Sequence, residues 1–190
     1  FLDSREKDPA YIARMEELEK QLQENVRQYR ETAGALLAEL AEAGFLVDSL
    51  DVFIHTNLDY RAAIPILMRW LPRISDRRVK EGIVRSLTVK WAKPLAAPLL
   101  IEEFLRAGDP WHGLKWAIGN ALSVVADDSV FEDLVRLVRD KSHGRAREML
   151  AVALANMRNP QAIDVLIELL DDEDIAGHAL LALRKLGKKA

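Results

Sequence analysis

The stretch GLKWAIGNAL, residues 113–122, decides the fold, because three other stretches of the chain share its pattern. Residues 78–87 (RVKEGIVRSL), 145–154 (RAREMLAVAL) and 174–183 (DIAGHALLAL) align with it without gaps on a final leucine. The residues four and eight positions before that leucine are apolar or small in every copy: Ile83, Ile118, Leu150 and Ala179, then Val79, Leu114, Ala146 and Ile175. A stripe at i, i+4 and i+8 forms one buried face of a helix. The sequence therefore predicts four equivalent helices.

A second set of helices alternates with the first. Residues 63–71 (AIPILMRWL), 97–105 (APLLIEEFL), 130–138 (VFEDLVRLV) and 162–170 (AIDVLIELL) are apolar or small at their first, fifth, eighth and ninth positions. Their starts at 63, 97, 130 and 162 lie 34, 33 and 32 residues apart. Self-similarity at this period is typical of stacked helix pairs. We expect an all-α fold, namely an α-solenoid (superhelix) of antiparallel helix pairs over residues 44–190.

Two further features accompany each repeat. An acidic residue stands in the turn between paired helices, as Asp76, Asp109, Asp140 and Asp172. Three second helices open with an apolar and then a basic residue: Val79-Lys80, Leu114-Lys115 and Ala146-Arg147. With these features the pattern resembles the HEAT repeat, including the short HEAT-like variant of phycobilisome lyases. The last repeat departs from it with Ile175-Ala176. The resemblance covers residues 63–190 and implies the fold, but it carries little information about chemistry.

The N-terminal segment predicts one long amphipathic helix over residues 9–43. Asp8-Pro9 combines an N-cap with a first-turn proline, and Ala43-Gly44 supplies a C-terminal stop. Between them apolar residues recur mostly at spacings of three and four: Ile12, Met15, Leu18, Leu22, Val26, Tyr29, Ala33, Leu36, Leu37 and Leu40. Two hypotheses stay open: the helix caps the first repeat, or its seam from Ile12 to Leu40 forms a homodimer. Residues 1–8 are expected to be disordered.

Composition restricts the function classes. The chain of 190 residues has no cysteine, which excludes structural disulfides, Cys-ligated zinc and thiol catalysis. Its net charge of −3 divides into −6 for residues 1–62 (seven Lys or Arg, thirteen Asp or Glu) and +3 for residues 63–190 (twenty and seventeen). A dedicated nucleic-acid binder is much more basic, so the composition does not favour nucleic acid as a partner. Because no apolar run could cross a bilayer and no signal-peptide pattern is visible, we expect a cytoplasmic protein without membrane contact.

Sequence motifs of common active sites do not occur. The chain contains no P-loop, no dinucleotide-binding glycine pattern, no HExxH motif and no nucleophile elbow. Three of the four histidines, His112, His143 and His178, fall at different positions of their repeats, so the fold does not bring them together. We therefore expect no catalytic residues, no metal site and no cofactor.

The HEAT resemblance places the second helices on the concave side of the solenoid. Their outward positions give the candidate protein-binding residues Lys80, Glu81, Arg85, His112, Lys115, Trp116, Asn120, Arg147 and Glu148. Equivalent positions in stacked repeats form columns, so Lys80, Lys115 and Arg147 are expected in one partly exposed row, with Trp116 and Asn120 at its centre. Under the alternative hypothesis these three cations pair with acids of neighbouring repeats. Trp116 could equally pack between helices.

These features favour a non-enzymatic adaptor that binds a protein partner, with an acidic or extended segment, through the concave face. One alternative is a HEAT-like DNA alkyl-base glycosylase or a DNA-binding protein. Trp116 and the six basic residues against one acidic residue in 77–93 suggest it, although no carboxylate stands clearly beside Trp116. The other alternative is a tetrapyrrole chaperone similar to the phycobilisome lyases, which rests on the fold alone.

Overall fold

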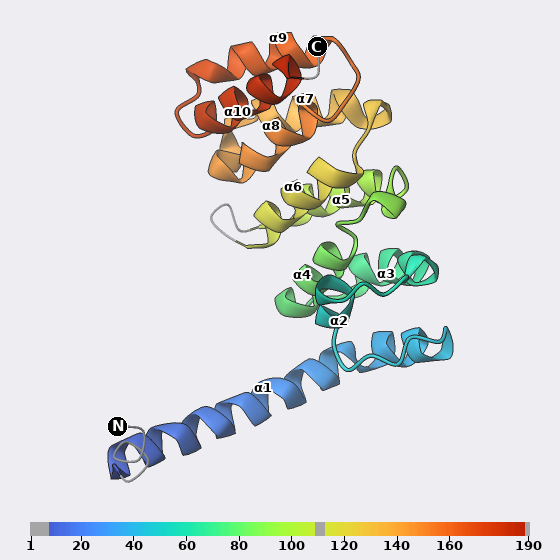
Figure 1. Ribbon diagram of the computed structural model, residues 1–190, viewed down its shortest axis with the longest axis vertical. Helices are drawn as coiled ribbons and strands as arrows, with labels where there is room; N and C mark the ends of the chain where they lie inside the picture. Colours follow the sequence, from blue (N-terminus) through green and yellow to red (C-terminus); the bar gives the residue numbers. More distant parts are fainter. Residues whose placement is uncertain (1–7, 109–112, 189–190) are drawn as a thin grey trace.

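The computed structural model describes residues 8–108 and 113–188, and these residues form helices and connecting turns without any strand (Figure 1). The all-α prediction is therefore confirmed. Four helix pairs stack along the long axis of the molecule, and one long helix lies at the N-terminal end of the stack (Figure 1). None of the described helices is both long and apolar enough to cross a membrane.

The helix bounds follow the predicted repeats. The first helices of the pairs are α3 (Ile64–Trp70), α5 (Ala96–Arg106), α7 (Phe131–Arg139) and α9 (Gln161–Glu168). The second helices are α4 (Arg77–Ser86), α6 (Leu114–Val125), α8 (Glu148–Leu154) and α10 (Ala176–Gly187). Short 3-10 turns precede, extend or join them at η1 (Arg61–Ala63), η2 (Leu71–Arg73), η3 (Lys90–Ala92), η4 (Asp128–Val130), η5 (Lys141–Arg147) and η6 (Leu169–Asp171).

The aligned leucines of the second helices lie in one continuous core. Leu87, Leu122 and Leu154 are fully buried, because each second helix contacts the second helix of the next pair. Leu183 is only partly buried. It belongs to the last pair, beyond which the described residues place no further helix, so one side of α10 stays open. The predicted register of the repeats is therefore correct in all four copies.

A glycine lies where two second helices pack closely against each other. At Gly119 of α6, an added Cβ would lie 3.1 Å from Cβ of Met149 and 3.5 Å from the carbonyl oxygen of Ala146. These distances leave no comfortable room for a side chain, so Gly119 allows α8 to pack directly on α6. The small residue directly before each aligned leucine has the same effect, since Ser86, Ala121, Ala153 and Ala182 are all buried.

The long helix α1 (Pro9–Glu42) begins and ends close to the predicted positions. Oδ1 of Asp8 accepts a hydrogen bond from the amide of Ala10, and Gly44 follows the helix with a φ of 92° that favours glycine. The helix is continuous through Gly34. Near its C-terminal end Ala33, Leu36 and Leu40 are fully buried, and α1 contacts α3 and α4 there. This part of α1 covers the first helix pair.

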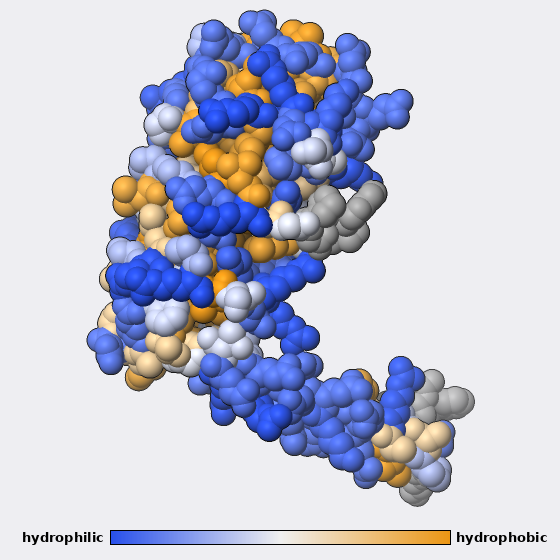
Figure 2. All heavy atoms as spheres, turned by 180° about the vertical axis from the view of Figure 1, so that it is seen from behind, coloured by the Kyte–Doolittle hydropathy of each residue, from blue (hydrophilic) through white to orange (hydrophobic). Residues whose placement is uncertain are grey.

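The rest of α1 projects beyond the stack as an arm (Figure 1, Figure 2). Its apolar side chains at positions 11, 12, 15, 18, 22 and 26 are between 42% and 63% exposed. Hydrogen bonds tie the base of the arm to the stack: Nη1 of Arg78 donates to Oδ1 of Asn25 at 3.0 Å, and the amide of Leu50 donates to the hydroxyl of Tyr29 at 3.1 Å. A short helix, α2 (Asp51–His55), joins α1 to the first pair and packs on α4.

Candidate functional site

Trp116 lies on the surface at the middle of the stack. It belongs to α6, and 43% of the residue is exposed. Asn120 follows one turn later on the same face of the helix and is half-buried. The hypothesis that Trp116 packs between helices is therefore wrong, and its indole is available for contact with another molecule.

Arg85 and Glu81 occupy the equivalent face of α4, the neighbouring second helix. Arg85 donates to Oε1 of Glu81 from Nε at 3.0 Å and from Nη2 at 2.7 Å. Half of the Arg85 side chain remains exposed. The pair is a surface ion pair that contributes little to stability and whose charges remain accessible to a partner.

Lys80 points away from this face into the next repeat. Its Nζ lies 2.6 Å from Oε2 of Glu103, a carboxylate on α5 that is almost completely buried. The other oxygen of Glu103 accepts a hydrogen bond of 2.9 Å from Nη1 of Arg106. Two cations therefore compensate one buried carboxylate, and Lys80 joins the first pair to the second.

Lys115 is also turned inward, and its predicted exposure is wrong. The residue is 7% exposed, with Nζ 3.2 Å from Nδ1 of His143 and 5.2 Å from the centre of the Phe104 ring. The ring of His143 packs edge-on against Phe104. Burial and the neighbouring Lys115 ammonium both lower the pKa of His143, so this imidazole is held in its neutral form. The lysine is part of the packing between α5, α6 and η5.

Arg147 is the most buried of the three cations, with no exposed surface at all. Nη1 donates to Oδ2 of Asp172 at 2.8 Å, and Nη2 donates to Oδ1 at 3.2 Å, so the guanidinium binds the carboxylate in a bidentate manner. Further bonds run from Nη1 to the carbonyl oxygen of Val138 and from Nε to that of Gly144. Hydrogen bonds from Arg147 hold the pKa of Asp172 below its usual value. The prediction of an exposed Arg147 is therefore wrong.

Glu148 does not lie on an exposed face either. The residue is buried, and its Oε1 accepts a hydrogen bond of 2.8 Å from Nε of Arg145. The continuous basic row of the sequence prediction does not form, because residues one position after the first apolar residue face the neighbouring repeat. His112, the remaining candidate, lies outside the described residues. For Lys80 and Arg147 the structure agrees with the alternative hypothesis, in which the cations pair with acids of the next repeat.

The surface that does form consists of one position in each second helix together with Trp116. Arg85, Asn120, Val152 and Leu181 all stand two residues before the aligned leucine, and α4, α6, α8 and α10 pack in that order. Arg85 and Leu181 are exposed, whereas Asn120 and Val152 are half-buried. We call these four residues and Trp116 the second-helix face. The same alignment points to Val152 and Leu181, although neither was among the candidate residues predicted from the sequence.

The second-helix face is charged at one end and apolar at the other. Arg85 and Glu81 stand at the N-terminal end, Trp116 and Asn120 at the centre, and Val152 and Leu181 toward the C-terminal end. Among the described residues no group of three or more His, Asp or Glu could hold a metal ion. The arrangement suits noncovalent contact with a partner of mixed apolar and polar character.

Comparisons with known proteins agree with the fold. The family model described as HEAT repeats matches residues 97–184, which span α5 to α10. No curated protein and no solved structure matches the chain. The matched segment contains Trp116, Asn120, Val152 and Leu181, so most of the second-helix face lies on the recognised repeats.

Proposed function

We propose that this chain, a HEAT-repeat protein over residues 97–184, is a non-enzymatic adaptor that binds a protein partner through its second-helix face. HEAT repeats commonly mediate protein interactions, and stacked repeats offer a long rigid surface for them. The observation that carries the proposal is the exposure of Trp116 at the centre of that face. Exposed tryptophans surrounded by half-buried neighbours are typical of the residues that dominate binding energy at protein interfaces.

The chemistry of the face indicates the kind of partner. A partner segment that lies along α4, α6, α8 and α10 would meet Arg85 first, then the indole and amide of Trp116 and Asn120, and finally Leu181. An extended segment with an acidic residue at one end and apolar residues at the other would complement this order. The acidic residue would share the Arg85 guanidinium with Glu81.

The positions of the cations favour a protein partner over DNA. A DNA-binding groove needs lysines and arginines that can reach phosphates. Lys80, Lys115 and Arg147, which were expected in one partly exposed row, contact Glu103, His143 and Asp172 of the protein itself. They contribute to the packing between repeats and leave the face with little excess positive charge.

Substitution of Trp116 tests the proposal. Cross-linking of partners in cells that express the Trp116→Ala variant is expected to lose the principal cross-linked protein, because truncation of a central aromatic residue typically weakens binding by more than about 2 kcal/mol. Trp91→Ala is the matched control, since Trp91 is 40% exposed and lies in η3, outside the second-helix face. Thermal unfolding of both variants checks that the fold is intact. Unchanged cross-linking in Trp116→Ala would contradict the proposal.

A further inference from the structure

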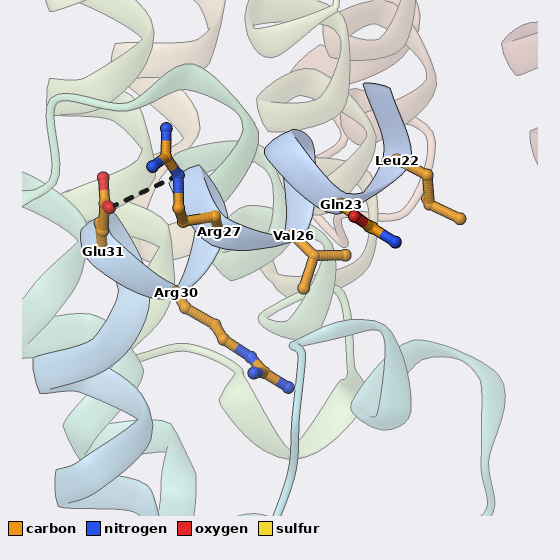
Figure 3. Close-up of a pocket in the computed structure, with 6 residues that line it drawn as sticks. All are labelled: Leu22, Gln23, Val26, Arg27, Arg30 and Glu31. Atoms are coloured by element: carbon orange, nitrogen blue, oxygen red, sulfur yellow. Dashed lines mark ion pairs between the residues drawn. The ribbon is translucent and has the colours of Figure 1, made fainter. Parts of the chain in front are cut away.

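The second-helix face and the hollow along the arm of α1 are built in different ways. Six residues line that hollow, and all of them, including Leu22 and Val26, belong to α1 (Figure 3). The second-helix face instead takes one position from each of α4, α6, α8 and α10. Side chains that several packed helices supply are held at a fixed spacing. A ligand that follows the second-helix face must match this spacing.

The packing of the second helices sets the distance between successive positions on the face. Packed helices lie about 8–10 Å apart, because their side chains interdigitate. The positions that follow one another at about this interval are Arg85, Asn120, Val152 and Leu181. A linear segment that lies across the four helices contacts all four positions only if it presents one side chain to the face at every such interval.

Asn120 adds a requirement for the backbone of the ligand. The residue is half-buried and lies one helical turn after the exposed Trp116. Its carboxamide hydrogen-bonds to none of the residues that the structure describes, whereas its backbone carbonyl accepts from the hydroxyl of Ser123 at 2.7 Å. A carboxamide carries both donors and an acceptor. It can therefore bond to a ligand whose own backbone N–H and C=O groups are free.

Three regular conformations of a ligand segment differ on these two requirements. A β-strand turns every second side chain to one side, so that side chains facing the protein lie about 6.8 or 13.6 Å apart, and neither distance matches neighbouring helices. An α-helix presents a side chain about every 10.5 Å in steps of seven residues, but its N–H and C=O groups are bonded within the helix. A polyproline II segment presents every third side chain to one side, about 9.3 Å apart, and its backbone forms no internal hydrogen bonds. Of the three, the polyproline II conformation meets both requirements.

We propose that the second-helix face binds a proline-rich segment of a partner protein in the polyproline II conformation. This inference rests on the proposed function, because it concerns the same face. An acidic residue of the segment pairs with Arg85, and a proline ring packs on the indole of Trp116, as proline-rich ligands do on aromatic side chains elsewhere. The carboxamide of Asn120 bonds to a peptide group of the segment. Two apolar side chains, three residues apart, contact Val152 and Leu181.

Synthetic peptides test the spacing. The in-register peptide has glutamate at one end, leucine six and nine residues further on and proline at all other positions, and it is made in both chain directions. The out-of-register peptide has the same composition, with the leucines five and seven residues from the glutamate, so that the three side chains point to three different sides. Fluorescence anisotropy of the labelled peptides with the 190-residue chain measures the dissociation constants.

The in-register peptide, in one of its two directions, is expected to bind at least about tenfold more tightly than the out-of-register peptide, because only its three side chains meet the face together. Equal binding of the two peptides would overturn the proposal, since the period of three would then have no effect. Absence of binding by every peptide would overturn it as well.

Variants of the chain test the individual contacts. Trp116→Ala and Asn120→Ala are each expected to weaken binding of the in-register peptide about tenfold or more, because the first removes the aromatic platform and the second removes the backbone contact. Ile167→Ala is the matched control, since Ile167 is exposed on α9, outside the second-helix face. Thermal unfolding checks that all three variants are folded. If Asn120→Ala binds the peptide as tightly as the original chain, recognition of the ligand backbone is refuted, and the polyproline II conformation with it.

The peptide and cross-linking experiments distinguish this inference from the proposed function. If Trp116→Ala loses its cross-linked partner in cells while no peptide binds, the face binds a partner in another conformation, and the polyproline II inference alone is wrong. If cross-linking is unchanged in Trp116→Ala and no peptide binds, the proposed function is wrong as well.

Discussion

Replacement of Arg147 by alanine is expected to destabilise the protein more than any surface substitution. The side chain is fully buried between α7, η5 and the turn before α10, and it makes hydrogen bonds to Asp172, to Val138 and to Gly144. Alanine removes all of these bonds at once. It also leaves the carboxylate of Asp172, which is itself buried, without its cation.

The expected loss follows from the buried position of this ion pair. Removal of one partner of a buried pair costs about 3–5 kcal/mol, because the other charge stays in a site of low polarity. The exposed pair of Arg85 and Glu81 is the comparison within the same chain, and Arg85→Ala is expected to cost about 0.2–1 kcal/mol. Urea unfolding followed by circular dichroism at neutral pH measures both free energies.

The pH dependence of the free energy of unfolding tests the same ion pair independently. Since Arg147 lowers the pKa of Asp172 in the folded state, the stabilisation from Asp172 is fully present above the unfolded pKa of about 3.9. It is lost as the pH falls through the lower folded pKa. The difference between the original chain and Arg147→Ala should therefore be largest near neutral pH and shrink in acid. A loss no larger than that of Arg85→Ala, or a difference that grows in acid, would refute this account of Arg147.

Three further substitutions and two deletions test other parts of the structure. Gly119→Ala should lower the melting temperature, because the added Cβ meets Met149 and overpacking costs about 1–3 kcal/mol. Gly34→Ala should instead raise the free energy of unfolding by up to about 1 kcal/mol, because an added Cβ there has nothing within 4 Å. Equal effects of the two changes would contradict the close approach of α6 and α8. The pKa of His143 is lower in the folded chain, so the unfolded chain binds the proton first as the pH falls, and the free energy of unfolding decreases from the unfolded pKa of about 6.5 down to the folded pKa. His143→Phe should therefore make this decrease smaller. An unchanged pH dependence of the free energy of unfolding, measured with urea, would argue against this role of His143. Deletion of residues 1–43 should produce aggregation in light scattering, because the cover of α3 and α4 is lost, whereas deletion of residues 1–28 should leave a folded chain. A stable, monomeric product of the longer deletion would show that the first pair needs no cover.

The sequence alone was sufficient for the helices and the register of the repeats. The apolar stripe that ends at Leu87, Leu122 and Leu154 has the period of a helix, and its repetition shows which faces stack. The ends of α1 could also be predicted, because Asp8, Pro9 and Gly44 act through local backbone geometry. Such features depend on residues that are close in the chain, and a sequence shows these neighbours directly.

Only the tertiary structure decided which candidate side chains are exposed. Lys80, Lys115 and Arg147 have long flexible side chains whose direction depends on two carboxylates and one imidazole that lie 23 to 28 residues away in the chain. Trp116 directly follows Lys115 on α6, and the helix turns by about 100° per residue, so Trp116 faces solvent although Lys115 is buried. The burial of the α1 seam at one end and its exposure at the other were also decided by the tertiary structure. The spacing of its apolar residues is uniform, but their contact with the stack ends at Tyr29, so the length of the neighbouring helices determines where the apolar residues become exposed.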